Sequence, residues 1–220
     1  MAAVALSFEA IDDLIYSARV GDLPSLQADI ENLSRQHNCS AASIIESAID
    51  SEDESEGGTR ACLLHWPAAN GNAEILRYLL SSIQKTSQHS PLINHPNHSG
   101  NTPLHWAALN THLECVKALV EAGADIDGKN GAGHDAAFLA ERSEWSAATE
   151  DEKEGEGDGE EATPAAASSQ PDRPMSKAMQ VVEYLLTYEK GTNSDQGADT
   201  PGSGNADADE MEGVIENGTS

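Results

Sequence analysis

Thr102-Pro-Leu-His-Trp-Ala-Ala-Leu-Asn-Thr-His-Leu-Glu-Cys-Val-Lys-Ala-Leu-Val120 aligns without a gap with Cys62-Leu-Leu-His-Trp-Pro-Ala-Ala-Asn-Gly-Asn-Ala-Glu-Ile-Leu-Arg-Tyr-Leu-Leu80. The two stretches share a His-Trp pair, an alanine, an asparagine, a glutamate and a leucine near the end at matching positions. Such self-similarity marks a repeat architecture, in which each unit buries its apolar face against its neighbours. We therefore expect a stack of similar units.

Each part of the repeat has a local structural reason. Thr102 suits the cap of a first helix, and Pro103 at the first helical position loses no needed hydrogen bond. Apolar residues from Leu113 to Val120 recur at helical spacing, which predicts a second helix. Gly123 then supplies the left-handed stop that ends this helix. The pattern resembles the ankyrin repeat, a turn plus two short helices in about 33 residues.

A further, interrupted unit follows. Gly133-His-Asp-Ala-Ala-Phe-Leu-Ala-Glu141 is a degenerate first helix, and Met179-Gln-Val-Val-Glu-Tyr-Leu-Leu186 carries the apolar stripe of its partner. Between them lies an acidic block, residues 150–161, followed by Ala/Ser/Pro-rich sequence. We interpret residues 146–174 as a disordered acidic insertion within one repeat, because the entropy of loop closure rises only slowly with loop length.

At the other end, residues 11–26 fit a diverged capping repeat with Gly21 at the turn between its helices. The predicted fold is all-α, an ankyrin-repeat solenoid of about four helix-turn-helix repeats with a disordered acidic insertion and tail. The predicted boundaries are 1–57 for the capping repeat and acidic loop, 58–145 for the central repeats, 146–174 for the insertion, 175–190 for the last ankyrin helix and 191–220 for the disordered acidic tail.

Pro67 conflicts locally with this pattern. It falls inside the first helix of its repeat, where a proline ring opposes the carbonyl four residues back at a cost of about 3 kcal/mol, less near a helix start. The sequence therefore predicts a shifted or kinked helix at this position.

The charge is large and unevenly distributed. The chain has 38 acids against 12 bases, a formal charge of −26, yet residues 58–149 hold only 8 acids and 6 bases. Acidic flanks repel phosphates and anionic membrane surfaces, so direct nucleic-acid and membrane binding are not expected. The natural complement is a strongly basic protein, although acid-rich tails also serve simply to keep proteins soluble.

Several other function classes are not favoured. Cys39, Cys62 and Cys115 fit no short metal-ligand spacing, so we expect free, mostly buried thiols in a reducing compartment. The histidines of residues 89–98 are irregularly spaced, and no phosphate loop or nucleophile–base arrangement is evident. No apolar run reaches the roughly 20 residues needed to cross a membrane, and Met1–Ala10 lacks the positive charge of a signal peptide. We expect no enzyme activity, no cofactor and no metal site.

The obvious functional feature of such a solenoid is its concave surface. Trp66 and Trp106 each follow the repeat histidine; they either pack between repeats or stay partly exposed as anchors for a bound peptide. The residues predicted to contact a partner are Asp22, Trp66, Asn70, His98, Asn101, Trp106, Leu109, Asn110, Lys129, His134 and Arg142.

The chain also resembles one particular family in the stretches 12–23, 68–71 and 100–107, and most of all in Lys129-Asn-Gly-Ala-Gly-His-Asp-Ala-Ala-Phe-Leu-Ala-Glu141. This family is the fungal ankyrin-repeat chaperones dedicated to small-subunit ribosomal protein three, the KH-domain protein of the small-subunit head. The acidic insertion, and Arg60 with Pro67, depart from the family pattern.

The resemblance implies a monomeric chaperone of the cytoplasm and nucleus. It would keep a basic small-subunit ribosomal protein soluble and support assembly and export of the small ribosomal subunit. The alternative is a generic ankyrin-repeat adaptor in signalling or transcription regulation, whose tails only solubilise. Ser51 and Ser55, set among acids, fit the context of an acid-directed kinase.

Overall fold

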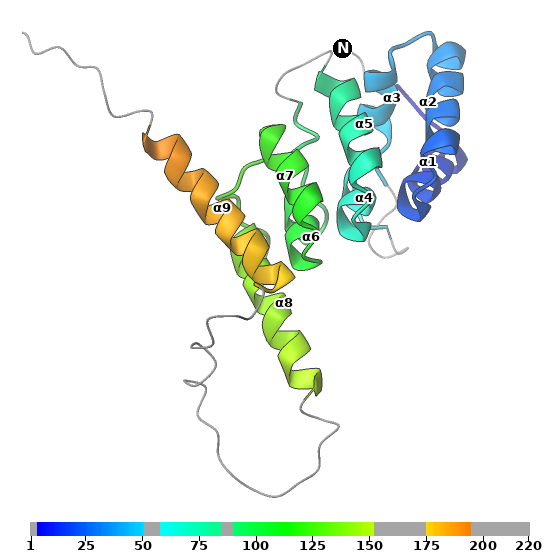
Figure 1. The fold of residues 1–220 in the computed structure, drawn as a ribbon. Coiled ribbons are helices and arrows are strands. Elements are labelled where there is room, and N and C mark those ends of the chain that lie inside the picture. The colour runs from blue at the N-terminus through cyan, green and yellow to red at the C-terminus, as the bar shows by residue number, and fades with distance from the viewer. Residues whose placement is uncertain (1–3, 51–57, 85–89, 152–174, 195–220) are drawn as a thin grey trace, which may run out of the picture.

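The helices of the protein, seen in a computed structural model, follow one another along a single stack (Figure 1). The structure describes residues 4–50, 58–84, 90–151 and 175–194. The helices are α1 (Phe8–Val20), α2 (Leu23–His37), α3 (Ala41–Ser47), α4 (His65–Asn70), α5 (Ala73–Gln84), α6 (Pro103–Leu109), α7 (Leu113–Glu121), α8 (Ala136–Asp151) and α9 (Lys177–Ser194). Within these ranges, pairing between extended segments is limited to one bridge, Ile49 to Cys62.

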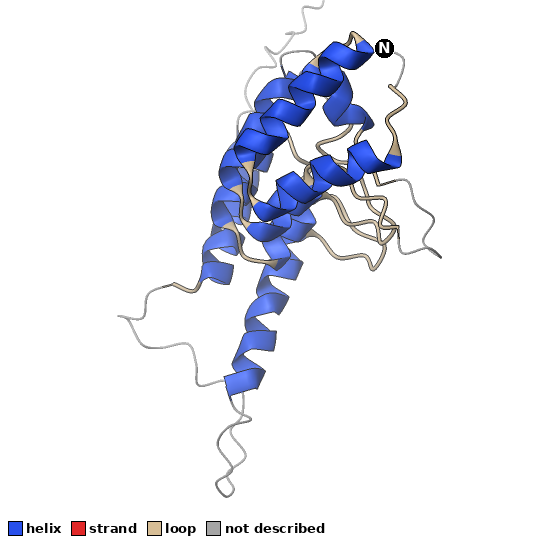
Figure 2. Cartoon of the chain, turned by 90° about the vertical axis from the view of Figure 1, so that its right-hand side faces the viewer, coloured by secondary structure: helices blue, strands red, loops and turns tan. Residues whose placement is uncertain are grey.

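The helices form two layers. In the inner layer α1 contacts α4, α4 contacts α6 and α6 contacts α8; in the outer layer α3 contacts α5, α5 contacts α7 and α7 contacts α9. The loops that join successive units gather on one side of the stack (Figure 2). This arrangement confirms the predicted all-α ankyrin solenoid.

The core is a continuous apolar seam between the layers. Leu76, Leu79 and Ile83 of α5 are fully buried, as are Val116 and Leu119 of α7. Each such side chain contributes about 1.5–3 kcal/mol when it leaves water. The small residues Ala68, Ala107 and Ala108 are also fully buried, so the inner helices pack closely.

Helix α3 is the element that the sequence analysis missed. It begins after Ser40, whose side chain accepts a hydrogen bond from the Ser43 backbone N–H. Its Ala42, Ile44 and Ile45 are buried at 2%, 0% and 0% exposure. Helix α2 contacts α3, and α3 contacts α5. This short helix therefore connects the outer layer of the first unit with that of the second.

The helix around Pro67 is shifted, as predicted. Helix α6 begins at Pro103, whereas α4 begins at His65, which aligns with His105. Pro67 therefore lies in the first turn of α4. Backbone N–H groups of a first turn have no partner within the helix, so the missing N–H costs little.

The last repeat is assembled as predicted, with two differences in its boundaries. Helix α9 packs along α8 and buries Ala178, Val181 and Leu185. However, α8 continues to Asp151, so the helix includes residues 146–151, which the sequence analysis placed in the insertion. Alanine and glutamate in that stretch are good helix formers and extend the helix. Likewise α9 runs to Ser194 rather than ending at 190. The disorder predicted for residues 152–174 and for most of the tail concerns residues outside those described.

Neighbouring loops approach each other most closely at two glycines. Gly100 has a φ of +76°, and a Cβ added there would lie 2.5 Å from the backbone nitrogen of Gly131. A Cβ on Gly131 would lie 2.8 Å from the carbonyl oxygen of Ser99. Gly133 has a similar φ of +81° but nothing within 4 Å of the added atom. Gly100 is therefore required both for its backbone conformation and for the space it leaves.

We predict that Gly100→Ala lowers the free energy of unfolding by about 3–4 kcal/mol, because left-handed strain adds to a displacement of the facing backbone. Gly133→Ala is the matched control and should lose only the strain, about 1–2 kcal/mol. Urea unfolding followed by circular dichroism measures both. Equal losses of unfolding free energy in the two variants would show that the close approach of Gly100 to Gly131 does not add to the cost of the substitution.

Candidate partner-binding surface

Two similar loop tips, residues 97–101 and 130–134, stand next to each other beside the inner helices. The His98 N–H donates to the Thr59 carbonyl of the preceding loop at 3.0 Å, and the Gly131 N–H donates to the Ser99 carbonyl at 2.9 Å. The tips and the preceding loop are thus joined edge to edge by backbone hydrogen bonds. These backbone hydrogen bonds fix the position of each tip relative to its neighbour.

An asparagine holds each tip in shape. The Asn97 side-chain oxygen accepts from the N–H groups of Ser99 and Asn101, at 3.0 and 2.9 Å. Asn130 does the same for Ala132 and His134, both at 3.0 Å. The amide of Asn130 also donates to the side-chain oxygen of Asn101 at 2.8 Å, which ties the second tip to the first.

The repeat histidines connect the inner helices to these tips. The His65 Nδ1 accepts from the Cys62 N–H at 3.1 Å, so Nε2 carries the proton and donates to the Asn101 carbonyl at 3.0 Å. His105 repeats the arrangement, from the Thr102 N–H at 3.2 Å to the His134 carbonyl at 3.1 Å. Each imidazole joins its own helix start to the tip of the next unit.

Burial keeps these imidazoles neutral. It lowers the pKa of His65 to about 4, and it also lowers the pKa of His105. A protonated ring has no acceptor nitrogen, so it would lose the bond from its own helix start. The link between units therefore depends on the neutral form.

The tryptophans combine both interpretations left open by the sequence. Trp66 and Trp106 are half-buried and pack edge to face with ring centroids 5.2 Å apart, so they join adjacent repeats and keep part of each indole exposed. Trp106 also packs edge-on against His65 at 5.0 Å. The guanidinium of Arg19 lies 5.2 Å from the Trp66 ring centroid. Sequence reasoning missed Arg19, whose only signal is its place at the end of the first inner helix.

Other exposed apolar groups extend this surface. Leu109, at the end of α6, is 42% exposed, and Phe138 on α8 is 43% exposed. The Phe138 ring stacks on the His134 imidazole with centroids 4.2 Å apart. We call the set of Arg19, Trp66, Trp106, Leu109, His134 and Phe138 the aromatic surface.

Some predicted contact residues have internal roles. Asp22 caps α2 and accepts from the Ser25 N–H and hydroxyl, and these bonds lower the pKa of its carboxyl. The Asn70 amide donates to the Arg19 carbonyl at 2.8 Å, and the Asn110 amide donates to the Trp106 carbonyl at 2.9 Å. These side chains position the inner helices. A direct contact with a partner stays a prediction for all three.

The remaining predicted residues divide between the tips and α8. His98 and Lys129 are exposed in or beside the tips, and Arg142 is exposed on α8. Asn101 supplies the carbonyl that receives the His65 link and is half-buried. The structure therefore brings the tip residues together near the aromatic surface and leaves Asp22 at the turn between α1 and α2.

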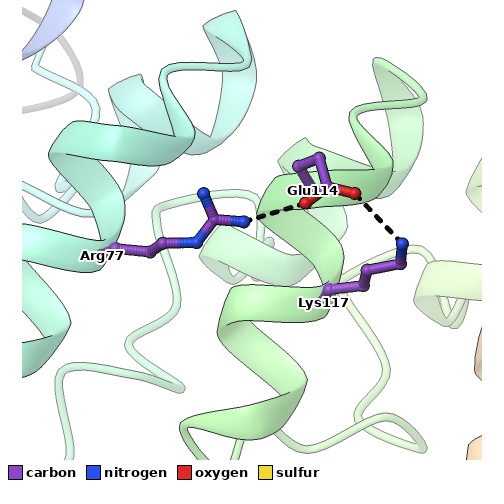
Figure 3. A network of polar contacts seen from close by, with 3 residues as sticks. All are labelled: Arg77, Glu114 and Lys117. Atoms are coloured by element: carbon purple, nitrogen blue, oxygen red, sulfur yellow. Dashed lines mark hydrogen bonds and ion pairs between the residues drawn. The ribbon is translucent and has the colours of Figure 1, made fainter.

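The outer layer presents a polar face. Glu114 of α7 accepts from Arg77 of α5 at 2.9 Å and from Lys117 at 3.0 Å (Figure 3). The Arg77 and Glu114 side chains are 55% and 61% exposed, so solvent screens the pair and it adds little stability. The contrast with the aromatic surface favours the inner side as the binding side.

Other chemistry has little support. Cys62 lies 3.1 Å from the His65 Nδ1, but burial raises the pKa of its thiol to about 12. The described ranges contain no cluster of three or more His, Cys, Asp or Glu side chains able to hold a metal. They also contain no helix with the length and apolar character of a membrane span. All three cysteines are free thiols, as predicted.

Comparisons with known proteins agree with this architecture. A family model for ankyrin repeats, three copies, matches residues 30–130. One chain of the crystal structure of the yeast ribosomal protein Rps3 in complex with its chaperone Yar1 matches with 34% identity and a TM-score of 0.54, over 71% of this chain and 100% of that one. The protein belongs to the ankyrin-repeat family and, within it, to the relatives of Yar1.

Curated sequences give the same family. The chain is 37% identical over 142 residues to the ankyrin repeat-containing protein YAR1 of Saccharomyces cerevisiae, which is 63% of this chain and 65% of the relative. Shorter matches include the NF-kappa-B p105 subunit of Rattus norvegicus, 40% over 65 residues, and a putative palmitoyltransferase, ZDHHC13, of Danio rerio, 37% over 78 residues. The chain spans just under two thirds of the yeast relative, 6% of the p105 subunit and 11% of the ZDHHC13 protein.

The neutral histidine links predict an acid-sensitive fold. The unfolded chain takes up a proton at a pKa of about 6.5, whereas folded His65 does so at about 4. Stability should be complete above pH 6.5 and fall as the pH drops from 6.5 towards 4, by roughly 2 kcal/mol for this residue at pH 5. Urea unfolding at pH 7.5 and pH 5, in high salt to screen the carboxylates, measures the loss.

His65→Gln is the control for this acid sensitivity. The variant should be less stable at pH 7.5 but lose less stability on acidification, because glutamine does not titrate. If His65→Gln loses as much unfolding free energy between pH 7.5 and pH 5 as the wild type, the group responsible for the acid sensitivity is not His65.

Proposed function

We propose that the protein is a dedicated chaperone that binds a basic ribosomal protein of the small subunit, the counterpart of yeast Rps3, and keeps it soluble. One observation carries the proposal: the chain aligns with the whole of a chain solved in the complex of Rps3 with its chaperone Yar1, at 34% identity. Helices α4 and α6 and the tip of residues 97–101 lie within residues 30–130, which the ankyrin-repeat model matches.

The charge distribution supports a basic partner. The net charge of −26 lies mainly outside residues 58–149, so the flanks attract cations while the central repeats stay close to neutral. Attraction of this kind raises the encounter rate and is screened beyond about 8 Å at physiological salt. A free ribosomal protein exposes the positive charge with which it binds RNA. Acidic flanks would cover that charge until assembly.

The protein acts in this proposal by binding rather than by catalysis. Its work would be carried out in the cytoplasm and nucleus, where it would support assembly and export of the small ribosomal subunit. The second candidate is a generic ankyrin adaptor in signalling or transcription regulation, which the match to the NF-kappa-B p105 subunit favours. That match covers 30% of this chain, against 63% for the yeast YAR1 protein.

Co-expression with the counterpart of Rps3, followed by affinity purification at moderate salt, tests the chaperone. We expect a soluble, stoichiometric complex, and a ribosomal protein that precipitates when expressed alone. If the ribosomal protein stays insoluble and unbound, the chaperone proposal is wrong and the ankyrin adaptor is the remaining candidate.

A variant with the carboxylates of residues 152–161 replaced by their amides keeps the chain length and removes the charge. This variant should bind the counterpart of Rps3 with a lower association rate, and that rate should depend less on salt concentration, because electrostatic steering is reduced. Salt-dependent association kinetics measure this effect. An adaptor with purely solubilising acids would keep its association rate.

A further inference from the structure

The centre of the aromatic surface lacks the carboxylates that a basic partner would be expected to meet. Helix α4 reads His-Trp-Pro-Ala-Ala-Asn and α6 reads Pro-Leu-His-Trp-Ala-Ala-Leu, so neither inner helix carries an acid. The groups these helices present instead are the indoles of Trp66 and Trp106. Indole is the aromatic side chain whose face attracts cations most strongly.

The Trp66 indole already holds a cation from the protein's own chain. The Arg19 guanidinium lies 5.2 Å from the ring centroid, within the range of a cation–π contact. In the described part of the chain Arg19 forms no ion pair with a carboxylate, and the residue is exposed.

The backbone at Arg19 is fixed while its side chain is not. The Arg19 carbonyl accepts hydrogen bonds from the amides of Asn70 and Asn72 at 2.8 and 3.4 Å, which hold the end of α1 against the second repeat. The guanidinium, in contrast, has the indole face as its one recorded contact within the described residues. It can therefore swing away without disturbing the helix.

The Trp66 indole is partly enclosed by the protein. Its Nε1 is buried and, among the described residues, has no hydrogen-bond acceptor. The Trp66 and Trp106 rings pack edge to face with centroids 5.2 Å apart, so side chains of two repeats meet at this point. The next aromatic ring, Phe138, differs because the His134 imidazole stacks on its face.

We propose that the face of Trp66 is a seat for a guanidinium, filled by Arg19 in the free protein and by an arginine of the bound partner in the complex. This inference rests on the proposed function for the source of that arginine. Arg19 then acts as an internal competitor: a partner without a suitably placed arginine cannot displace it. The seat selects for arginine at a place on the aromatic surface where the two central inner helices, α4 and α6, carry no acid.

The test uses two probes. One is the full-length counterpart of Rps3; the other is a pair of short alanine-based helical peptides, one with arginines and one with citrulline, the uncharged isostere, at the same positions. Dissociation constants are measured by calorimetry for the wild-type chain, Arg19→Ala, Arg19→Lys, Trp66→Leu and Tyr188→Leu; Tyr188 is an exposed aromatic residue of α9, outside the aromatic surface. Circular dichroism confirms that each variant folds.

We expect Arg19→Ala to bind the arginine peptide about three- to tenfold more tightly than the wild type, because the competitor is gone, and Trp66→Leu to bind about tenfold more weakly. Arg19→Lys, which keeps a cation on the indole, and Tyr188→Leu, the control outside the aromatic surface, should stay within about twofold of the wild type. The citrulline peptide should bind weakly to every variant. Binding to the ribosomal protein should change in the same directions.

Weaker or unchanged binding by Arg19→Ala, or equal binding of the arginine and citrulline peptides, overturns the inference. If Trp66→Leu does not fold, the sign of the Arg19→Ala effect decides. If the ribosomal protein does not bind the wild type while the peptides show the expected pattern, the proposed function fails and the guanidinium seat stands.

Discussion

The stack depends on one bridging interaction, the repeat histidine. The neutral imidazole of His65 accepts from the start of its own helix and donates to the Asn101 carbonyl in the next tip. His105 does the same towards His134. A single side chain thus sets the start of an inner helix, the position of a tip and the spacing between two units. This histidine bridge therefore also determines the positions of the hydrogen-bonded tips and of the two indoles.

The same bridge shows which departures from the repeat the fold tolerates. Cys62 aligns with Thr102 although it precedes α4 by three residues, and the bond to the ring is kept because the Cys62 backbone N–H makes it. Phe138 stands at the histidine position of the last unit, where the described structure places no further tip to hold, and Asp135 takes over the helix start by accepting from the Phe138 N–H at 2.8 Å. Residues can therefore vary wherever they do not link two units.

The sequence predicts the features that repeat and misses those that occur once. Aligning the His-Trp stretches gives the solenoid, the shifted helix at Pro67 and the pairing of α8 with α9 across the acidic insertion. Helix α3 has no counterpart elsewhere in the chain and is only seven residues long, so no periodic signal identifies it. The internal roles of Asn70 and Arg19 are equally hidden, because they depend on a contact between residues 51 positions apart.

The central inner helices α4 and α6 carry no acid, whereas most of the negative charge lies outside residues 58–149. This separation suits the binding of a protein rich in positive charge. A carboxylate at the crowded centre of the inner layer would have to shed water on binding, and that desolvation offsets much of its attraction for a cation. An indole face attracts a guanidinium without carrying a charge that must be desolvated. Carboxylates of the flanks would act over a longer range and would speed encounter rather than fix geometry. In the proposed complex, charge outside the central repeats and aromatic rings within them would therefore make different contributions, one to the association rate and one to specificity.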